Sequence, residues 1–285
     1  MFQGNLIFVS GKGGVGKSAV TAALAILAAR DGKRVLALGL TDTAGLAGHL
    51  RAERVGYEPT EVRRGLSIAS VDRARALDEY LKLQLRVPQA VPTKPLSNAL
   101  NVLVDTAPGI REIVSIGKPI YEVWRGTWDL VVVDAPPTGQ IESYLGAPVT
   151  IRELVPAGIV QDQARSLADT LQSPATGLIL VSTPSELSVL ETIETADRLR
   201  MRADVPNPAL IANRVFDELG ISGEVVEELP DGPARDAALL HEHLYQAQEH
   251  WLRELGASVE LPFLFGLLTP GEVAARLARV LEETG

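Results

Sequence analysis

The chain has 285 residues, of which 46% are hydrophobic and 22% are charged, a composition typical of a globular protein. Its 27 basic and 36 acidic residues give a formal net charge of −9, which argues against a nucleic-acid partner. The sequence has no cysteine, so disulfides and thiolate metal sites are excluded. It has no apolar run of the roughly 18 residues that span a bilayer and no basic leader, and we therefore expect a cytoplasmic protein.

Short apolar, β-branched runs alternate with longer helical patterns along the chain. The runs lie at 6–9, 34–40, 66–71, 129–133, 177–181, 209–212 and 258–261. The first and fourth are almost continuously apolar, as expected of strands that helices cover on both faces. The spacers are long enough for crossover helices. The pattern predicts an α/β fold with a doubly wound, mainly parallel sheet in a single domain, 1–285.

The stretch 72–127 differs from the rest of the chain. It holds helical patterns at 74–85, 96–104 and 110–123 that are interrupted by prolines, and it has no convincing strand. We interpret it as a helical insertion packed on one end of the sheet. A second change in composition, at 217–236, predicts an exposed acidic connection that leads to an amphipathic helix at about 237–255.

A glycine-rich loop follows the first predicted strand and opens a helix at about 19–29. Its sequence, Gly-Lys-Gly-Gly-Val-Gly-Lys-Ser at 11–18, fits the phosphate loop G-x-x-x-x-G-K-[ST]. In such a loop Lys17 neutralises the β- and γ-phosphates and Ser18 ligates Mg²⁺. The predicted nucleotide-binding residues here are Gly11, Lys12, Gly13, Gly14, Val15, Gly16, Lys17, Ser18 and Ala19.

The same glycines also satisfy the dinucleotide fingerprint G-x-G-x-x-G. In that alternative, Asp42 beyond the second strand would hold a ribose, and the protein would be an NAD(P)-dependent oxidoreductase. The pair Lys17–Ser18 discriminates between the two, because a triphosphate needs a cation at the start of the helix and a dinucleotide does not.

Two aspartates follow predicted strands at the edge of the sheet where α/β proteins bind ligands. Asp134 ends the run 129–133 and is predicted to accept a Mg²⁺-bound water, the alternative being a cap of the next helix. Residues 136–140, Pro-Pro-Thr-Gly-Gln, suit a switch that senses the γ-phosphate. Asp42 is predicted to orient the attacking water, or to cap a helix, and the two roles can coexist.

Together these residues resemble the arsenical-pump (ArsA) and tail-anchored-protein-targeting ATPase family, within the deviant phosphate-loop ATPases that include MinD and ParA. The defining mark is Lys12, and the resemblance implies that this lysine reaches across a dimer interface to the partner's nucleotide. Asp42 matches the family's water-orienting aspartate. Residues 134–139 look like the family's second switch, D-x-A-P-T-G, with Pro136 in place of alanine.

The resemblance covers almost the whole chain. Segments 107–110, 183–186, 191–192 and 210–215 resemble family segments in the same order and spacing, most closely those of short bacterial ArsA-like paralogues. It implies that Asn213 reads adenine, and the alternative is an asparagine that forms a turn after the strand. Thr43 and Gly45 stand where relatives have Pro and His, so the geometry of the first switch stays open.

The resemblance implies a Mg²⁺-dependent ATPase that binds ATP and ADP and works as a homodimer or as a heterodimer with a paralogue. Hydrolysis would be coupled to binding or delivery of a client, either an anion-pump partner in a membrane or a hydrophobic protein segment, at the insertion 72–127. The alternative is a surface-organising ATPase like MinD or ParA. That alternative calls for a basic amphipathic C-terminal helix, whereas 271–284 mixes arginine with glutamate.

Overall fold

In the computed structural model, the described residues are 4–84, 109–202, 205–221 and 223–284. The strands are β1 (Leu6–Gly11), β2 (Val35–Gly39), β3 (Thr60–Arg63), β4 (Leu66–Ser70), β5 (Leu130–Asp134), β6 (Thr176–Ser182), β7 (Pro208–Val215) and β8 (Val259–Pro262). The helices are α1 (Lys17–Arg30), α2 (Ala44–Leu50), α3 (Arg73–Gln84), α5 (Ile110–Trp124), α6 (Thr138–Leu154), α7 (Ile159–Gln172), α8 (Glu186–Arg200), α9 (Gly223–Glu227), α10 (Pro233–Leu255) and α11 (Pro270–Thr284).

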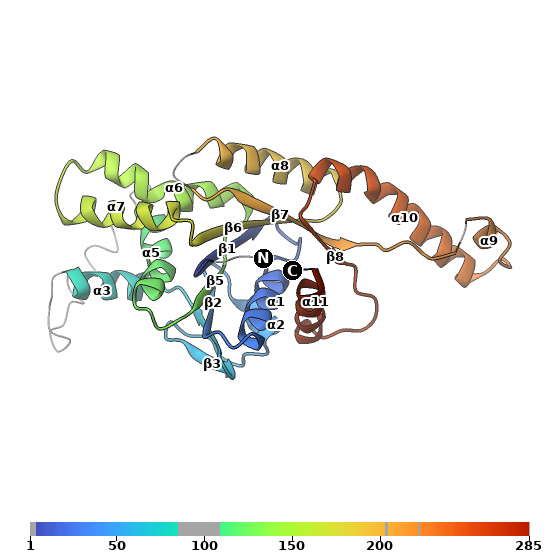
Figure 1. Ribbon diagram of the computed structural model, residues 1–285, viewed down its shortest axis with the longest axis horizontal. Helices are drawn as coiled ribbons and strands as arrows, with labels where there is room; N and C mark the ends of the chain where they lie inside the picture. Colours follow the sequence, from blue (N-terminus) through green and yellow to red (C-terminus); the bar gives the residue numbers. More distant parts are fainter. Residues whose placement is uncertain (1–3, 85–108, 203–204, 222, 285) are drawn as a thin grey trace.

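The strands form one sheet in the order β3-β4-β2-β5-β1-β6-β7-β8 (Figure 1). Every neighbouring pair is parallel except β3 and β4. The predicted mainly parallel α/β sheet is therefore confirmed, and all seven predicted runs are strands. The sequence pattern missed β3, because this four-residue edge strand is mostly exposed and polar and has no apolar run.

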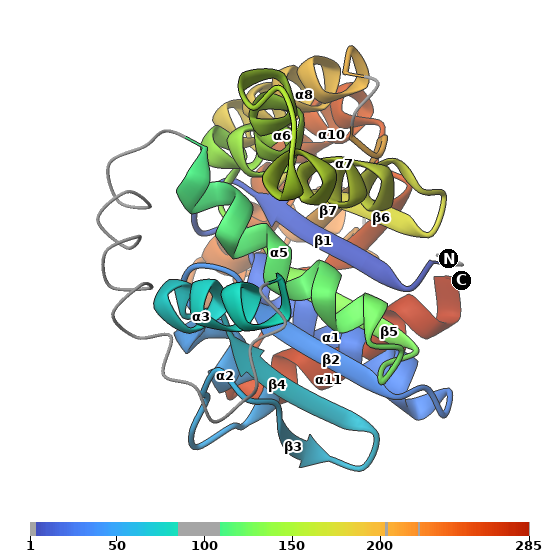
Figure 2. The same cartoon turned by 90° about the vertical axis from the view of Figure 1, so that its left-hand side faces the viewer.

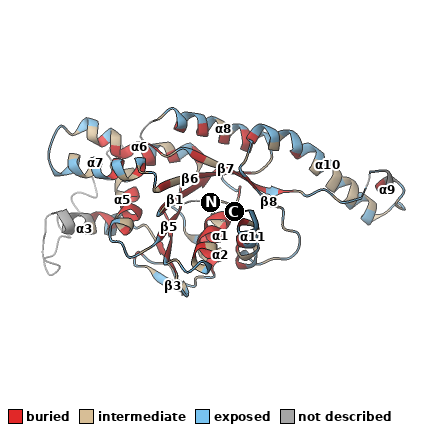
Figure 3. Ribbon diagram, viewed as in Figure 1, coloured by how far each residue is buried: buried red, intermediate tan, exposed pale blue. Residues whose placement is uncertain are grey.

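Helices cover both faces of the sheet, which explains why its central strands are apolar throughout. Ile7 and Val9 pack in a core with α1, α2 and α11, whereas Leu6 and Phe8 pack in a second core with α5, α6, α7, α8 and α10. Figure 2 shows these two helical layers on opposite sides of the strands, and Figure 3 shows the burial concentrated in the sheet and α1. Successive residues of a strand point to opposite faces, so the inner strands supply both cores.

Of the predicted insertion 72–127, the structure describes 72–84 and 109–127. Both described helices, α3 and α5, agree with the predicted helical patterns, whereas the predicted helix at 96–104 lies outside the described residues. The α5 side chains Ile116 and Ile120 are fully buried in the second core, the one that contains Leu6 and Phe8. This helix is therefore part of the layer that covers the sheet, and α3 packs against its outer side.

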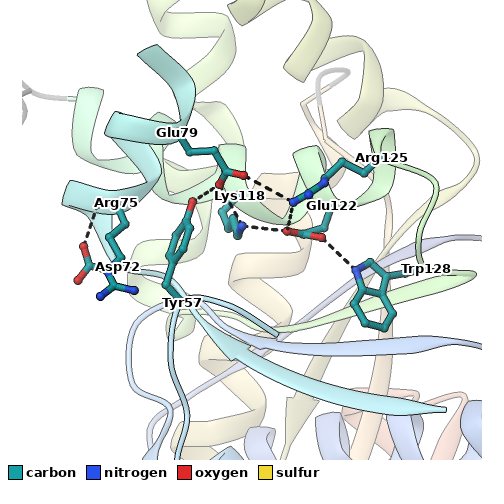
Figure 4. Close-up of polar contacts among 8 residues, drawn as sticks. All are labelled: Tyr57, Asp72, Arg75, Glu79, Lys118, Glu122, Arg125 and Trp128. Atoms are coloured by element: carbon teal, nitrogen blue, oxygen red, sulfur yellow. Dashed lines mark hydrogen bonds and ion pairs between the residues drawn. The ribbon is translucent and has the colours of Figure 1, made fainter. Parts of the chain in front are cut away.

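A buried cluster of charges joins α3 to α5 (Figure 4). The side chain of Lys118 is 1% exposed, and its Nζ lies 3.0 Å from Glu79 Oε2 and 2.8 Å from Glu122 Oε1. The same ammonium lies 4.0 Å from the centre of the Tyr57 ring, and the Trp128 indole N–H donates to Glu122. Each buried charge has an opposite partner, which is the condition under which charges are tolerated inside a protein.

We expect Lys118→Met to lower the free energy of unfolding by about 3 to 5 kcal/mol, because it leaves the buried carboxylate of Glu122 without its nearest cation. The double variant Lys118→Met with Glu122→Gln removes that charge and should recover part of the loss. Urea unfolding followed by circular dichroism measures both. A single variant as stable as the wild type would show that the cluster does not hold α3 and α5 together.

The acidic connection leads to an arm that extends away from the sheet, formed by α9 and the first half of α10 (Figure 1). The predicted helix is confirmed, but it begins at Pro233. Only Gln248 and Leu255 of α10 are fully buried among its described side chains. His241 of this helix lies against Phe216 and Phe265. In the described parts of the chain, no helix is long and apolar enough to cross a bilayer.

Candidate functional site: a phosphate loop at the sheet edge

The glycine-rich loop connects the end of β1 to the start of α1, at the carboxyl edge of the sheet. Gly16 precedes the first helical residue with φ 96°. The first turn of α1, all of it described, contains no acidic residue. A helix begins with backbone N–H groups that have no intrahelical partner and with a positive dipole end, so the start of α1 attracts an anion.

Asn213 supports this loop from the neighbouring part of the sheet. Its side-chain Nδ2–H donates to the backbone carbonyl of Val15 at 2.8 Å, and the side chain is buried. A Cβ on Gly16 would lie only 2.4 Å from Asn213 Nδ2. Position 16 therefore needs glycine both for its positive φ and for this close approach. The adenine-reading role of Asn213 stays a prediction.

Ser18 and Asp134 meet at the base of the loop, as the predicted magnesium site requires. The Ser18 hydroxyl donates to Asp134 Oδ2 at 2.6 Å, although the two residues are 116 positions apart. Asp134 is 4% exposed, and its Oδ1 has no hydrogen-bond partner among the described residues. The alternative cap role does not fit, because α6 begins only at Thr138 and Asp134 faces Ser18.

The surroundings of Asp134 disfavour its charged form. Burial and, to a smaller extent, the nearby carboxylate of Asp42 raise its pKa to about 6, although the Ser18 hydroxyl and the charge of Lys17 act in the opposite direction. A buried carboxyl oxygen without a partner, beside a serine hydroxyl, is a set of hard oxygen donors that suits Mg²⁺ or a water bound to it. The residues present therefore fit the ion that the sequence predicts.

Asp42 lies between β2 and α2, near the same edge. Its Oδ1 accepts a hydrogen bond at 2.9 Å from the backbone N–H of Ala44, the first residue of α2. Asp42 thus stabilises the start of a helix, which was one of its two predicted roles. Its side chain is exposed, and its charge acts on Asp134, so a carboxylate at the mouth of the site is also available to orient water.

Gly45 explains one departure of the first switch from the family pattern. A Cβ at this position would lie 2.9 Å from Ser18 Oγ and 3.2 Å from Ser18 Cβ. The first turn of α2 therefore lies directly against Ser18, the predicted magnesium ligand, and a side chain at position 45 would push the hydroxyl or the helix aside. The geometry around Ser18 favours the smallest residue at position 45.

We expect Gly45→Ala to weaken Mg²⁺-nucleotide binding roughly tenfold, because the added methyl group must push Ser18 or α2 aside. Gly48→Ala is the matched control on the same helix, since its Cβ would meet only Pro270 at an ordinary 3.8 Å. Isothermal titration with Mg²⁺ and a slowly hydrolysed ATP analogue measures both affinities. Equal affinities in the two variants would contradict the proposed contact with Ser18.

The ammonium of Lys12 has an acidic partner that the sequence analysis did not identify. Nζ of Lys12 lies 3.2 Å from Oε2 of Glu191 in α8, and the hydroxyl of Thr138, at the start of α6, donates to Oε1 of the same carboxylate. These contacts keep the pKa of Glu191 below its usual value, with the Thr138 hydroxyl as the largest favourable cause. Position 191 stood out in the sequence only as part of a resembling segment, with no role attached.

Aromatic side chains gather just beyond the ends of β7 and β8. The rings of Phe216 and Phe263 are stacked with their centres 4.8 Å apart, and Phe265 packs against both. Phe263 and Phe265 are among the exposed large hydrophobic residues. Three aromatic residues in the two segments that follow β7 and β8 leave no periodic signal, so the sequence analysis could not find this cluster.

The comparison with known protein families agrees with the site. A family model described as anion-transporting ATPase matches residues 4–157, just over half of the chain. The chain belongs to the anion-transporting ATPase family. The resemblance to ArsA and to the tail-anchored-protein-targeting ATPases is thereby confirmed. The matched residues include the phosphate loop, Asp42 and Asp134, and they end before Glu191 and Asn213.

Curated relatives extend the similarity beyond the family match. ATPase BagA of Mycobacterium tuberculosis is 30% identical over 220 residues, which are 73% of this chain and 64% of the relative. ATPase ASNA1 homolog 1 of Paramecium tetraurelia is 32% identical over 143 residues, 50% of this chain and 43% of the relative. ATPase get3 of Schizosaccharomyces japonicus is 30% identical over 149 residues, 52% and 45% of the two chains. The chain thus spans less than two thirds of the length of these relatives.

Proposed function

We propose that this chain is a Mg²⁺-dependent ATPase that acts as a nucleotide-switched dimer in the cytoplasm. The observation that supports this most directly is the buried pair of Ser18 and Asp134 at the base of the phosphate loop. A carboxyl oxygen that is buried without a partner is costly to the fold, and a metal–triphosphate complex would satisfy it. Family membership and the ATPase relatives support the same activity.

The nucleotide would bind with its phosphates in the loop 11–18. The open N-terminus of α1 and the ammonium of Lys17 supply positive charge for the β- and γ-phosphates. Ser18 and Asp134 would hold Mg²⁺, which neutralises charge that develops on the transferred phosphoryl group. The aromatic cluster of Phe216 and Phe263 offers a flat surface at the same edge of the sheet, where a base can stack.

Asp42 is the proposed water-orienting residue. The attacking water needs a hydrogen-bond acceptor on the far side of the γ-phosphate, and phosphoryl transfer depends mostly on such positioning. The exposed carboxylate of Asp42 keeps Oδ2 available while Oδ1 holds the start of α2. The geometry disfavours an NAD(P)-dependent oxidoreductase. In that alternative Asp42 would hold a ribose, whereas here its charge acts on Asp134, the proposed metal-binding residue.

The dimer and the client follow from the family resemblance. Each chain contains one phosphate loop, and Lys12 at its mouth would contribute to a site formed with a second copy or a paralogue. The client, an anion-pump partner or a hydrophobic protein segment, would bind the region 72–127. No observation favours the alternative of a surface-organising ATPase like MinD or ParA.

Asp42→Asn tests this mechanism. The amide oxygen can still accept from Ala44, so we expect nucleotide affinity to change little while turnover falls about 100-fold or more. Asp31→Asn, an exposed aspartate that caps the far end of α1, is the control. Phosphate release with Mg²⁺-ATP, and with EDTA added, measures activity. A wild-type chain that binds ATP but releases no phosphate would refute the proposed activity, and unchanged turnover in Asp42→Asn would leave Asp42 only its structural role.

The dimer is tested by sedimentation of the wild type with ADP and with ADP plus a γ-phosphate mimic. We expect a dimer with the mimic. Subunits carrying Lys12→Ala mixed with subunits carrying Asp42→Asn should then give rates that differ from the mean of the two. A monomer under every condition would contradict the proposal.

A further inference from the structure

The carboxylate of Glu191 connects the phosphate loop, the start of α6 and helix α8. Glu191 belongs to α8, and it binds Lys12 from the loop after β1 through Oε2 and Thr138 from the start of α6 through Oε1. Both partners belong to segments that are predicted to sense a γ-phosphate. Lys12 is part of the loop itself, and Thr138 follows Asp134 by four residues in the predicted second switch.

The two contacts of Glu191, one with Thr138 and one with Lys12, differ in burial. We call the two contacts together the Glu191 bridge. Thr138 is fully buried, whereas the side chains of Lys12 and Glu191 are 35% and 34% exposed. An ion pair that is partly open to solvent is weak, and it exchanges readily for a stronger counter-ion. A triphosphate, bound in the same loop or in that of a second copy, carries more negative charge than one carboxylate does, so it competes with Glu191 for the ammonium of Lys12.

The helix that provides Glu191 also presents apolar side chains to solvent. Leu187, one turn before Glu191, is 72% exposed, and Leu190 is 50% exposed. Breaking the contacts of Glu191 would therefore loosen the part of α8 that carries Leu187 and Leu190. On the described residues, this bridge is a direct route from the phosphate loop to α8 that does not pass through the sheet.

We propose that Glu191 is a positioning residue that holds Lys12 and Thr138 in the nucleotide-free chain, and that the γ-phosphate of ATP displaces it from Lys12. The nucleotide state then reaches α8, because Glu191 is released with ATP and stays paired with ADP. This inference rests on the proposed function, since it requires a triphosphate in the loop. It goes beyond that function by assigning a role to Glu191 and α8.

Hydrogen exchange of α8 tests the inference in the full chain. With Mg²⁺ and a non-hydrolysable ATP analogue, we expect residues 186–200 to exchange at least threefold faster than with Mg²⁺-ADP. In Glu191→Gln, exchange should already be fast without nucleotide, and the analogue should add nothing. The same variant should bind the analogue two- to fivefold more tightly than the wild type, with ADP affinity unchanged, because Lys12 is no longer shared.

Three further variants separate this role from a general effect on α8. Glu194→Gln is the matched control, because Glu194 is exposed and pairs with Arg198 on the same helix, and it should respond like the wild type. Thr138→Val should lose the response, and Thr138→Ser, which keeps the hydroxyl, should restore it. Equal exchange of α8 with ADP and with the bound analogue in the wild type would overturn the inference while leaving the ATPase intact. A chain that binds neither nucleotide would remove the proposed function and the inference with it.

Discussion

Lys17→Ala is expected to lower the affinity for Mg²⁺-ATP by about 100-fold, because the phosphates lose a charge-assisted hydrogen bond. Turnover should fall by a further factor of about 100 to 1000, since the same cation stabilises charge that develops on the transferred group. Lys17 is the first residue of α1, so alanine keeps the helix and the fold should remain. The loss would then be one of phosphate binding.

The control for this prediction is Lys33→Ala, which removes a lysine from the loop after α1, at the far end of the helix. Titration calorimetry gives the affinities, and ATP-dependent thermal stabilisation gives an independent reading. Wild-type stabilisation by ATP in Lys17→Ala would rule out the phosphate-loop assignment. A similar loss in Lys33→Ala would show a general effect of net charge.

Asp134→Asn should have two opposite effects. We expect Mg²⁺-dependent turnover to fall by about 100-fold or more, because the neutral amide is a poor ligand for a hard cation or its bound water. We expect the nucleotide-free protein to become more stable at pH 7 by about 1 to 2 kcal/mol, because the variant removes a buried charge whose Oδ1 has no hydrogen-bond partner. Activity and stability would thus change in opposite directions at one residue.

The pH dependence follows from the direction of the shift. Burial raises the pKa of Asp134 from 3.8 to about 6, so between these values the folded chain binds a proton that the unfolded chain has released. The contribution of this group to stability therefore decreases as pH rises from about 4 to 6. Mg²⁺ competes with the same proton, so Mg²⁺ affinity should increase over this range and reach a plateau above it.

Asp129→Asn is the control, because its carboxylate behaves in the opposite way. Hydrogen bonds from Arg34 lower the pKa of Asp129 to about 2, so its contribution to stability is present above the unfolded pKa and is lost as pH falls. This variant should keep its activity and should not gain stability. Urea unfolding at pH 5 and pH 7 distinguishes the two aspartates. Loss of stability in Asp134→Asn at pH 7 would show that its buried carboxylate already has a compensating partner.

Local patterns in the sequence determined the sheet and the phosphate loop. Continuous apolar runs identify strands covered on both faces, and this information lies within a few neighbouring residues. The glycines and lysines of 11–18 likewise form a motif whose chemistry is readable without tertiary structure. The sequence pattern did not predict the edge strand β3, because its residues are mostly polar. Its pairing with β4 is decided by the completed sheet.

The tertiary structure alone decided which side chains meet at the site. Ser18 reaches Asp134 across 116 residues, and Asn213 reaches Val15 across 198, because parallel strands bring their carboxyl ends to one edge whatever their separation along the chain. Glu191 illustrates the limit most clearly. Its pairing with Lys12 depends on how α8 packs beside the loop, and no periodicity or spacing in the sequence encodes that packing.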